Sequence, residues 1–449
     1  MDSSRHERLL ALDRAHVWHP FTQMAVWPSD DPLIIERAEG NELVDDLGRR
    51  YLDGVSSLWC NVHGHRRREI DDAVRAQLDR VAHSTLLGLA SVPSIELAEA
   101  LVRIAPGGMT RVFYSDSGST SVEVALKMAY QYWQQRGRPE KTRFAALAES
   151  YHGDTVGSVS VGGMELFHGT FRGLLFGVER LPSPSPYHWT AAGDPLAGAL
   201  GAAERLLEEK ASTLAAVILE PLVQGAAGMW MHPPGYLRAM AELCRKHDVL
   251  LICDEVATGF GRTGTMFAVE QEGVRPDFLC LAKGLSGGYL PLAATLTTDR
   301  VHEAFLGEFD SARTFFHGHT FTGNPLACAA ALASLRLFET DGVLERVRRT
   351  AEALRPKLAA IAELPHVGDV RQRGLMVGVE LVRDRRTKEP YGYGERIGHR
   401  VCFALRRRGI LLRPLGAVVV MMPPLSLTEA EAVRLGDAVR EAIVEVTGA

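Results

Sequence analysis

The chain has 449 residues, of which 46% are hydrophobic and 23% charged, and its formal net charge is −5. This length predicts two or three domains with their own cores, and the nearly balanced charge disfavours nucleic acid as a partner. No apolar run approaches the length of a membrane span, and the N-terminus lacks a signal-peptide pattern. The six cysteines show no CxxC spacing, which predicts a reduced, cytoplasmic protein.

The predicted elements alternate between strands and helices over most of the chain. Residues 33–54 alternate apolar and polar side chains and predict a short antiparallel meander. Further strands are predicted at residues 111–114, 143–147, 214–219, 249–253, 277–282 and 292–297. Helices are predicted at residues 69–81, 94–104 and 235–247, after Ser119, and from Pro325. This alternation indicates an α/β fold with a doubly wound, mostly parallel sheet, and a change of pattern near residue 340 predicts a separate α+β domain.

Two predicted strands end on groups that can carry chemistry. Residues 249–253 stop on Asp254 and Glu255, and residues 277–282 lead into Lys283. The carboxyl ends of parallel strands are where α/β sheets bind their ligands. A lysine that captures an aldehyde and an acid that keeps a ring nitrogen protonated are the two groups that pyridoxal phosphate requires. A buried ion pair between Asp254 and Lys283 fits the same pattern equally well.

Two further clusters follow predicted strands. Ser117, Gly118 and Ser119 stand at the start of a long predicted helix, where hydroxyls and free N–H groups can bind a phosphate. Plain capping of the helix is the more frequent role for such residues. Tyr151 follows the strand of residues 143–147 and has an aromatic face that can stack on a flat ring, or simply pack.

Two motifs point to other chemistry and are set aside. Residues 259–264 match GxGxxG, but five residues (254–258) separate them from their strand and no long helix is predicted after them, so a dinucleotide site is disfavoured. Two HGH motifs could supply zinc ligands, but no cysteine or carboxylate stands at ligand spacing beside them. We predict no metal and leave open the roles of these histidines, which are His63, His65, His317 and His319.

Several motifs together resemble the class III aminotransferases, which have the type I fold of pyridoxal-phosphate enzymes. They are DSGS at residues 116–119, YHGD at 151–154, DEVATGFGRTG at 254–264 and AKG around Lys283. HPFTQ at 19–23, SSLWCNVHGH at 56–65 and HGHTFTGNPLACAA at 317–330 extend the resemblance over nearly the whole chain. The resemblance implies a large cofactor-binding domain of residues 65–339. It also implies a smaller domain built from residues 1–64 and 340–449.

The resemblance also implies roles around the cofactor. Lys283 is expected to bind the pyridoxal aldehyde as a Schiff base and to move protons, Asp254 to pair with the ring nitrogen, and Tyr151 to stack on the ring. The implied phosphate ligands are Ser117, Gly118 and Ser119. Thr320 is expected to reach the phosphate bound in the other subunit, so a homodimer with shared active sites is implied.

The implied substrates are small molecules. The resemblance points to amino transfer to 8-amino-7-oxononanoate (7-keto-8-aminopelargonate), which gives 7,8-diaminononanoate in biotin biosynthesis. Arg413 is expected to bind the carboxylate of this acid, and the other implied substrate-binding residues are Phe21, Trp59 and Gly318. The implied donor is S-adenosylmethionine or lysine. Lysine is considered because Phe21, Leu58 and Val420 stand where S-adenosylmethionine-using members commonly have tyrosine or tryptophan.

Two other functions fit parts of the pattern. Another class III ω-amino acid transaminase, acting on ornithine, 4-aminobutyrate or a broad range of amines, would use the same cofactor. A nucleotide-binding or regulatory protein built around the glycine-rich loop would leave Lys283 with a structural role. Binding of pyridoxal phosphate separates this last class from the two enzymes.

Overall fold

A seven-stranded sheet forms the centre of the structure, a computed structural model that describes residues 3–448. The sheet order is β4 (Met109–Ser115), β12 (Ala293–Thr298), β11 (Phe278–Leu281), β10 (Leu250–Asp254), β7 (Leu214–Leu219), β5 (Arg143–Leu147) and β6 (Val178–Leu181). The strands from β11 to β6 are mutually parallel, whereas β12 is antiparallel to both β11 and β4. The predicted doubly wound α/β sheet is confirmed, and it is mixed because residues 282–292 form a connection without a crossover helix.

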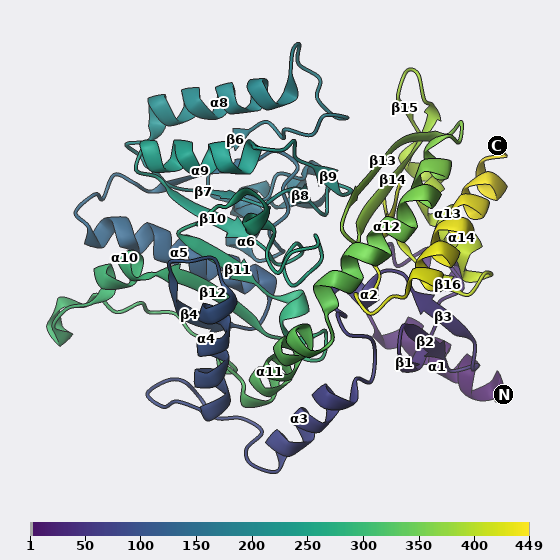
Figure 1. The fold of residues 1–449 in the computed structure, drawn as a ribbon, viewed down its shortest axis with the longest axis horizontal. Helices are drawn as coiled ribbons and strands as arrows, with labels where there is room; N and C mark the ends of the chain where they lie inside the picture. Colours follow the sequence, from purple (N-terminus) through teal and green to yellow (C-terminus); the bar gives the residue numbers. More distant parts are fainter. Residues whose placement is uncertain (1–2, 449) are drawn as a thin grey trace.

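Helices cover both faces of this sheet (Figure 1). Successive strand residues point to opposite faces, so Leu250 and Ile252 of β10 pack with α5, while Leu251 and Cys253 pack with the helices of the other face. The longer helices of this part are α3 (Arg68–Leu78), α4 (Val92–Ile104), α5 (Gly118–Gln135), α8 (Pro195–Lys210), α9 (Tyr236–Lys246) and α11 (Pro325–Thr340). The short ones are α6 (Val156–Val161), α7 (Glu165–His168) and α10 (Asp299–His302). Within residues 3–448, no helix is long and apolar enough to cross a membrane.

Elements from both ends of the chain lie together on the right of Figure 1. They are α1 (Ser3–His16), β1 (Ile35–Glu39), β2 (Glu42–Asp45), β3 (Arg50–Asp53), α12 (Val343–Ala362), β13 (Val367–Arg373), β14 (Met376–Asp384), α13 (Ile397–Arg406), β16 (Ile410–Leu411), β17 (Arg413–Leu415), β18 (Val418–Met421) and α14 (Glu429–Thr447). β16 pairs in parallel with β3, with Ile410 opposite Leu52, so the two chain ends share one sheet. The boundaries at residues 64 and 339 stay a prediction, since Val343 and Val418 pack into the core of the large sheet.

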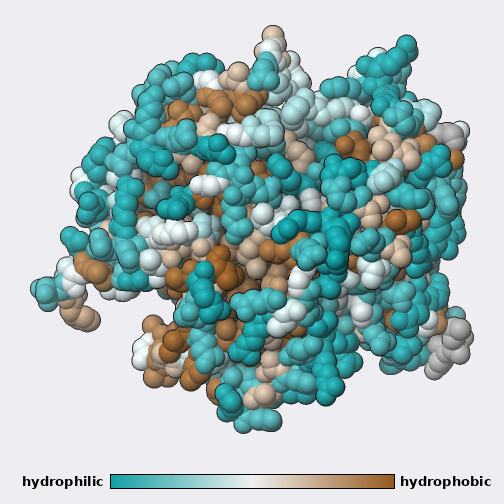
Figure 2. All heavy atoms as spheres, in the orientation of Figure 1, coloured by the Kyte–Doolittle hydropathy of each residue, from teal (hydrophilic) through white to brown (hydrophobic). Residues whose placement is uncertain are grey.

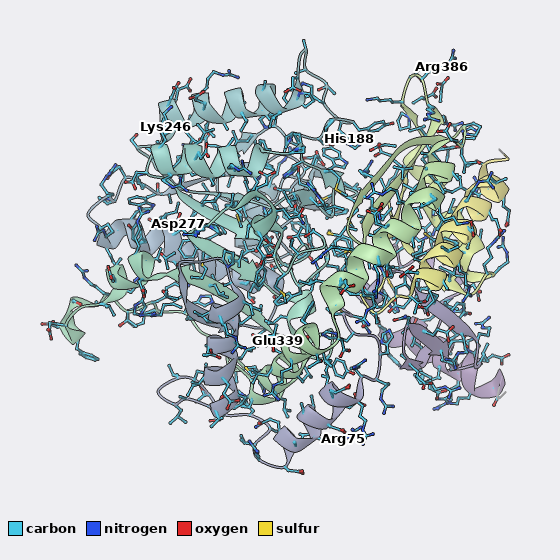
Figure 3. All side chains as sticks on the ribbon, in the orientation of Figure 1. Arg75, His188, Lys246, Asp277, Glu339 and Arg386 are labelled. Atoms are coloured by element: carbon cyan, nitrogen blue, oxygen red, sulfur yellow. The ribbon has the colours of Figure 1, made fainter. Side chains whose placement is uncertain are left out.

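The helix α1 was not predicted. Its few large apolar residues, Leu9, Leu10 and Leu12, cluster in one turn and do not recur along one face. The carboxyl ends of β7, β10 and β11 point toward the part on the right of Figure 1, and β5 is parallel to β7. Asp277, at the amino end of β11, lies on the opposite edge of the sheet (Figure 3).

Candidate active site

A pocket of about 720 Å³ lies at the carboxyl edge of the large sheet. Parallel pairing sets Cys253 of β10 opposite Leu219 of β7, so the residues that follow, Asp254 and Glu220, lie at adjacent strand ends. Seven of the predicted site residues line this pocket: Trp59, Ser117, Gly118, Ser119, Tyr151, Asp254 and Lys283. The fold therefore brings together predicted residues that are up to 224 positions apart, from Trp59 to Lys283.

Lys283 begins the turn η4 (Lys283–Ser286), with one residue between it and the end of β11, and turns its amine into the pocket. Within residues 3–448 its Nζ atom has no hydrogen-bond partner, and it lies 4.9 Å from the centre of the Trp59 ring. Burial lowers the pKa of Lys283, although the nearby charges of Asp254 and Glu220 oppose that shift. A lowered pKa increases the fraction of neutral amine, which is the nucleophilic form.

Asp254 is held by a histidine. Its Oδ2 atom lies 2.7 Å from Nδ1 of His152, and its Oδ1 atom accepts a hydrogen bond of 3.0 Å from the Val256 N–H. A carboxylate can only accept, so Nδ1 of His152 carries the proton of this contact. Asp254 and Lys283 are not within ion-pair distance in the part of the chain described, which disfavours the alternative of a buried ion pair. The Asp254 carboxylate is thus fixed in orientation while facing the pocket.

Glu220 fixes the main chain beneath Tyr151. One of its oxygens accepts a 3.1 Å hydrogen bond from the Tyr151 N–H, and the other accepts a 2.8 Å bond from the Gly225 N–H. Burial raises the pKa of Glu220 to about 7. The Tyr151 hydroxyl donates to Asp154 at 2.7 Å, and burial raises the pKa of Tyr151. Tyr151 is therefore held both at its main chain and at its hydroxyl.

The start of α5 forms the anion-binding side of the pocket. Ser117 caps the helix by accepting from the Thr120 N–H, in a reciprocal capping box. Gly118 and Ser119 begin the first turn, whose N–H groups have no acceptor within the helix and lie at its positive end. A Cβ atom at Gly118 would lie 2.6 Å from a methyl of Val256, so only glycine fits there. These features suit a phosphate group.

Four predicted residues do not line the pocket of this single chain. Phe21 is 58% exposed and packs edge-on against Phe167, whose ring in turn contacts Tyr151. Gly318 and Thr320 lie in the segment before α11. Arg413 is exposed on β17, opposite the buried Val420. The roles given to these four residues stay predictions.

The side chains of the two HGH motifs that were set aside contact other groups of the protein. The histidines of the two HGH motifs contact neighbouring polar groups: His63 with Ser334, His65 with Asp53, His317 with Lys127 and His319 with Asp116. Glu255, next to Asp254, turns away from the pocket and accepts from the Thr258 hydroxyl and from two main-chain N–H groups. The loop of residues 259–264 is followed only by the short turn η3 (Ala268–Glu272), which agrees with setting aside a dinucleotide site.

His152, Glu220 and Cys60 are among the residues of the pocket wall that had no predicted role. The signal for the first two was present, because each follows an apolar run that ends at the same sheet edge as Asp254. Cys60 gave no such signal, since it lies in a loop segment whose path depends on distant contacts.

The residues fit pyridoxal phosphate. The amine of Lys283 has no partner in the described chain, the carboxylate of Asp254 is held facing the pocket, and an aromatic ring flanks it. A helix N-terminus supplies N–H groups on the side of the pocket where Gly118 lies. This donor set matches the aldehyde, the ring nitrogen, the ring face and the phosphate of that cofactor.

Comparison with known proteins supports this chemistry. The family model for class III aminotransferases matches residues 24–443. An adenosylmethionine-8-amino-7-oxononanoate aminotransferase from Nitratidesulfovibrio vulgaris is 59% identical over 99% of this chain and 83% of the relative. The crystal structure of the enzyme of that name from Methanocaldococcus jannaschii has a TM-score of 0.94 and 50% identity, covering 98% of this chain and 99% of that one. An amine transaminase from an uncultivated Pseudomonas species, in its PLP-bound form, has a TM-score of 0.91 and 39% identity over 96% of this chain and 98% of that one.

Proposed function

This chain belongs to the class III aminotransferases, and from that premise we propose that it transfers an amino group to 8-amino-7-oxononanoate, giving 7,8-diaminononanoate in biotin biosynthesis. The observation that carries the proposal is the pocket in which Lys283 and Asp254 face the same space at adjacent strand ends. Relatives that share half or more of their residues with this chain along its whole length bear the name of that activity.

We propose that pyridoxal phosphate is the cofactor and that the pocket residues hold it. Lys283 would bind its aldehyde, Asp254 its ring nitrogen and Tyr151 its ring face. The phosphate would lie against the first turn of α5, at Ser117, Gly118 and Ser119. When bound, the cofactor supplies an aldehyde for the amine and a ring that accepts the electrons freed by loss of a proton from the substrate carbon.

The residues of the chain supply the proton transfers. The neutral amine of Lys283 would take a proton from the substrate carbon and, as the ammonium, would give it to the carbon of the cofactor that carried the aldehyde. Burial favours the neutral form that the first of these transfers requires. The carboxylate of Asp254 keeps a proton on the facing ring nitrogen, and the hydrogen bond with His152 holds it in place for that task. Glu220 keeps the Tyr151 main chain from shifting.

The amino donor in this proposal is S-adenosylmethionine or lysine. Leu58 is 52% exposed, so a large side chain at that position would have room beside the pocket residue Trp59. Val420 is buried on β18 and paired with Arg413, and it offers no hydroxyl to a ligand. The absence of aromatic and hydroxyl groups at these positions removes contacts that a sulfonium nucleoside could use, which favours lysine.

A second candidate is a transaminase of broader amine specificity. It is favoured by the structural similarity to amine transaminases, which reaches a TM-score of 0.94 at 33% identity for an omega transaminase from Pseudomonas jessenii. The two candidates share the cofactor and differ in the acceptor. An exposed arginine at position 413 supports an acceptor with a carboxylate.

We propose that two copies of the chain associate. Exposed apolar side chains gather around the segment that leads into α4, where Leu87 is 89% and Leu89 62% exposed. This region is the brown surface at the lower left of Figure 2. Phe316 and Phe321, in the segment that carries Thr320, are also exposed. Burial of these faces in a homodimer would remove them from water and bring Thr320 toward a second pocket.

We propose a cytoplasmic location for the enzyme. All six cysteines are free thiols, and five of them are buried. A reducing compartment keeps such thiols unpaired.

The decisive experiment measures amine transfer to 8-amino-7-oxononanoate by the purified holoenzyme, with S-adenosylmethionine and lysine offered separately. We expect formation of 7,8-diaminononanoate with at least one donor. Turnover with S-adenosylmethionine and none with lysine would contradict the preference for lysine. No product with either donor, together with consumption of other ω-amines, would contradict the acceptor and favour the broad transaminase.

A further inference from the structure

The glycine-rich loop of residues 259–264 places an arginine in the interior of the molecule. Arg262 is only 2% exposed, although its side chain is long and charged. Phe260, Gly261 and Gly264 have φ angles of 55°, 84° and 99°, so the loop folds back on itself and presents Arg262 inward. The loop therefore serves a contact inside the protein.

The guanidinium group of Arg262 links two distant segments. Its Nη2 atom donates to the Ser56 hydroxyl and to the Asn61 carbonyl, both at 2.8 Å, and its Nη1 atom donates to the Pro423 carbonyl. All these acceptors are neutral, and no carboxylate lies within ion-pair distance in the described chain. Burial lowers the pKa of Arg262 to about 10. Burial of a cation costs desolvation energy, and the hydrogen bonds to the three acceptors offset that cost.

The segment that Arg262 grips has an unfavourable backbone conformation. Ser56, Ser57 and Trp59 have φ angles of 45°, 61° and 64°, in the region that residues other than glycine avoid. Such a conformation is strained and persists only where its surroundings hold it. At Ser56 the segment is held by the Arg262 contacts and by a 2.7 Å hydrogen bond from the Ser56 hydroxyl to the Met422 carbonyl. At Ser57 it is held by Asp53, which accepts a 2.8 Å hydrogen bond from the Ser57 N–H and a 3.0 Å bond from its hydroxyl.

The same segment builds one wall of the active-site pocket. Trp59 and Cys60 line the pocket, and the Trp59 ring lies 4.9 Å from the amine of Lys283. Arg262 binds the segment on both sides of these two residues, at Ser56 and at Asn61. A loss of either contact would let the wall relax away from Lys283.

We propose that Arg262 is a positioning residue for the proposed transamination, because it clamps the strained segment of residues 56–61 and so holds Trp59 and Cys60 against the pocket. The planar fork of arginine reaches three acceptors on two segments at once, which the single ammonium group of lysine cannot do. This role rests on the proposed function for its effect on substrates. The clamp itself is measurable without any turnover.

Cys60 provides the direct measurement. It is partly exposed, whereas the other five cysteines are buried, so a thiol reagent such as dithiobis(nitrobenzoate) reports on the segment of residues 56–61. In holoenzyme carrying Arg262→Lys we expect Cys60 to react about tenfold faster, the effect of losing one hydrogen bond from a charged donor. Ser56→Ala, which removes one acceptor of the clamp, should act in the same direction, and Cys60→Ser identifies the thiol that reacts.

A matched control is Arg180→Lys. Arg180 also donates to main-chain carbonyls, those of Ser160, Val161 and Gly162, but it does not touch the pocket wall. This variant should leave the Cys60 reaction rate unchanged. Because Arg262 and Ser56 act through one contact, the double variant should show less than the product of the two single effects.

The kinetic readout separates positioning from a loss of folding. In Arg262→Lys the KM for the keto acid should rise about tenfold, while cofactor affinity, followed by absorbance, changes by less than about twofold. Wild-type Cys60 reaction rates in both Arg262→Lys and Ser56→Ala would overturn the proposal. Faster labelling of these variants, in an enzyme whose wild type does not aminate 8-amino-7-oxononanoate, would uphold the clamp and refute the proposed function.

Discussion

The two ends of the large sheet each hold a buried lysine beside a tryptophan. At the amino ends, Lys141 lies 4.2 Å from the Trp133 ring and donates to the carbonyls of Leu214 and Asp248, at 3.3 and 2.6 Å. At the carboxyl ends, Lys283 lies 4.9 Å from the Trp59 ring and has no hydrogen-bond partner in the described chain. Both amines lie beside a tryptophan ring, but one is satisfied by the protein and the other is left for a ligand.

This difference separates a structural lysine from a functional one. Burial lowers the pKa of both lysines, to about 8 for Lys141, so a lowered pKa alone does not identify the reactive amine. What identifies it is an amine that faces a pocket and lacks a partner. Parallel strands place that pocket at their carboxyl ends, where the chain leaves the sheet and can expose side chains.

The comparison predicts that only one of the two lysines is needed for turnover. Lys283→Ala should lower the rate of amine transfer by about 10³-fold or more, because the covalent hold on the cofactor and the proton carrier are both lost. Single-turnover kinetics on the loaded enzyme measure this effect. Lys141→Met is the matched control and should transfer amines at the wild-type rate; an equal loss in both variants would contradict the distinction.

The second prediction concerns stability at the amino ends of the strands. At pH 10, Lys141→Met should lower the free energy of unfolding by about 2 kcal/mol, because the carbonyls of Leu214 and Asp248 lose a buried donor. Urea unfolding followed by circular dichroism measures the change. Unfolding of Lys141→Met at the wild-type midpoint would show that these hydrogen bonds contribute nothing.

The smallest predicted effect is the pH dependence of the stability that Lys141→Met loses. The pKa of Lys141 is lowered to about 8 in the folded chain, below the ordinary value of about 10.4 in the unfolded one. Between these values the unfolded chain binds more protons, so this group makes the free energy of unfolding rise with pH. The difference between wild type and Lys141→Met should therefore shrink by about 1 kcal/mol from pH 10 to pH 9. A constant difference would contradict the lowered pKa.

Much of the carboxyl end of the sheet could be predicted from sequence. The strands of residues 143–147 and 214–219 have the bounds predicted from their apolar runs, and Asp254 and Lys283 follow such runs directly. Local patterns suffice there because a buried parallel strand is apolar throughout and ends abruptly. The antiparallel direction of β12 was not predictable in this way, since direction depends on how the preceding connection folds back.

Contacts between distant segments account for what was missed. Arg262 stands in a motif that suggests a phosphate loop, and only the folded chain shows that its partners are Ser56, Asn61 and Pro423. Likewise, His152 belongs to the YHGD motif of residues 151–154, but its pairing with Asp254 joins two strand ends 102 positions apart. No spacing rule links such residues, because the sheet order decides which ends are neighbours.

The pairing of β3 with β16 has a consequence for synthesis of the protein. Leu52 finds its partner Ile410 only after most of the chain has been translated. At translation rates of about 5–20 residues per second, the open edge of β3 waits roughly 20–70 s on the ribosome for the strand that covers it. An unpaired strand edge invites pairing with other chains, so the N-terminal sheet stays open to such pairing until β16 has been made.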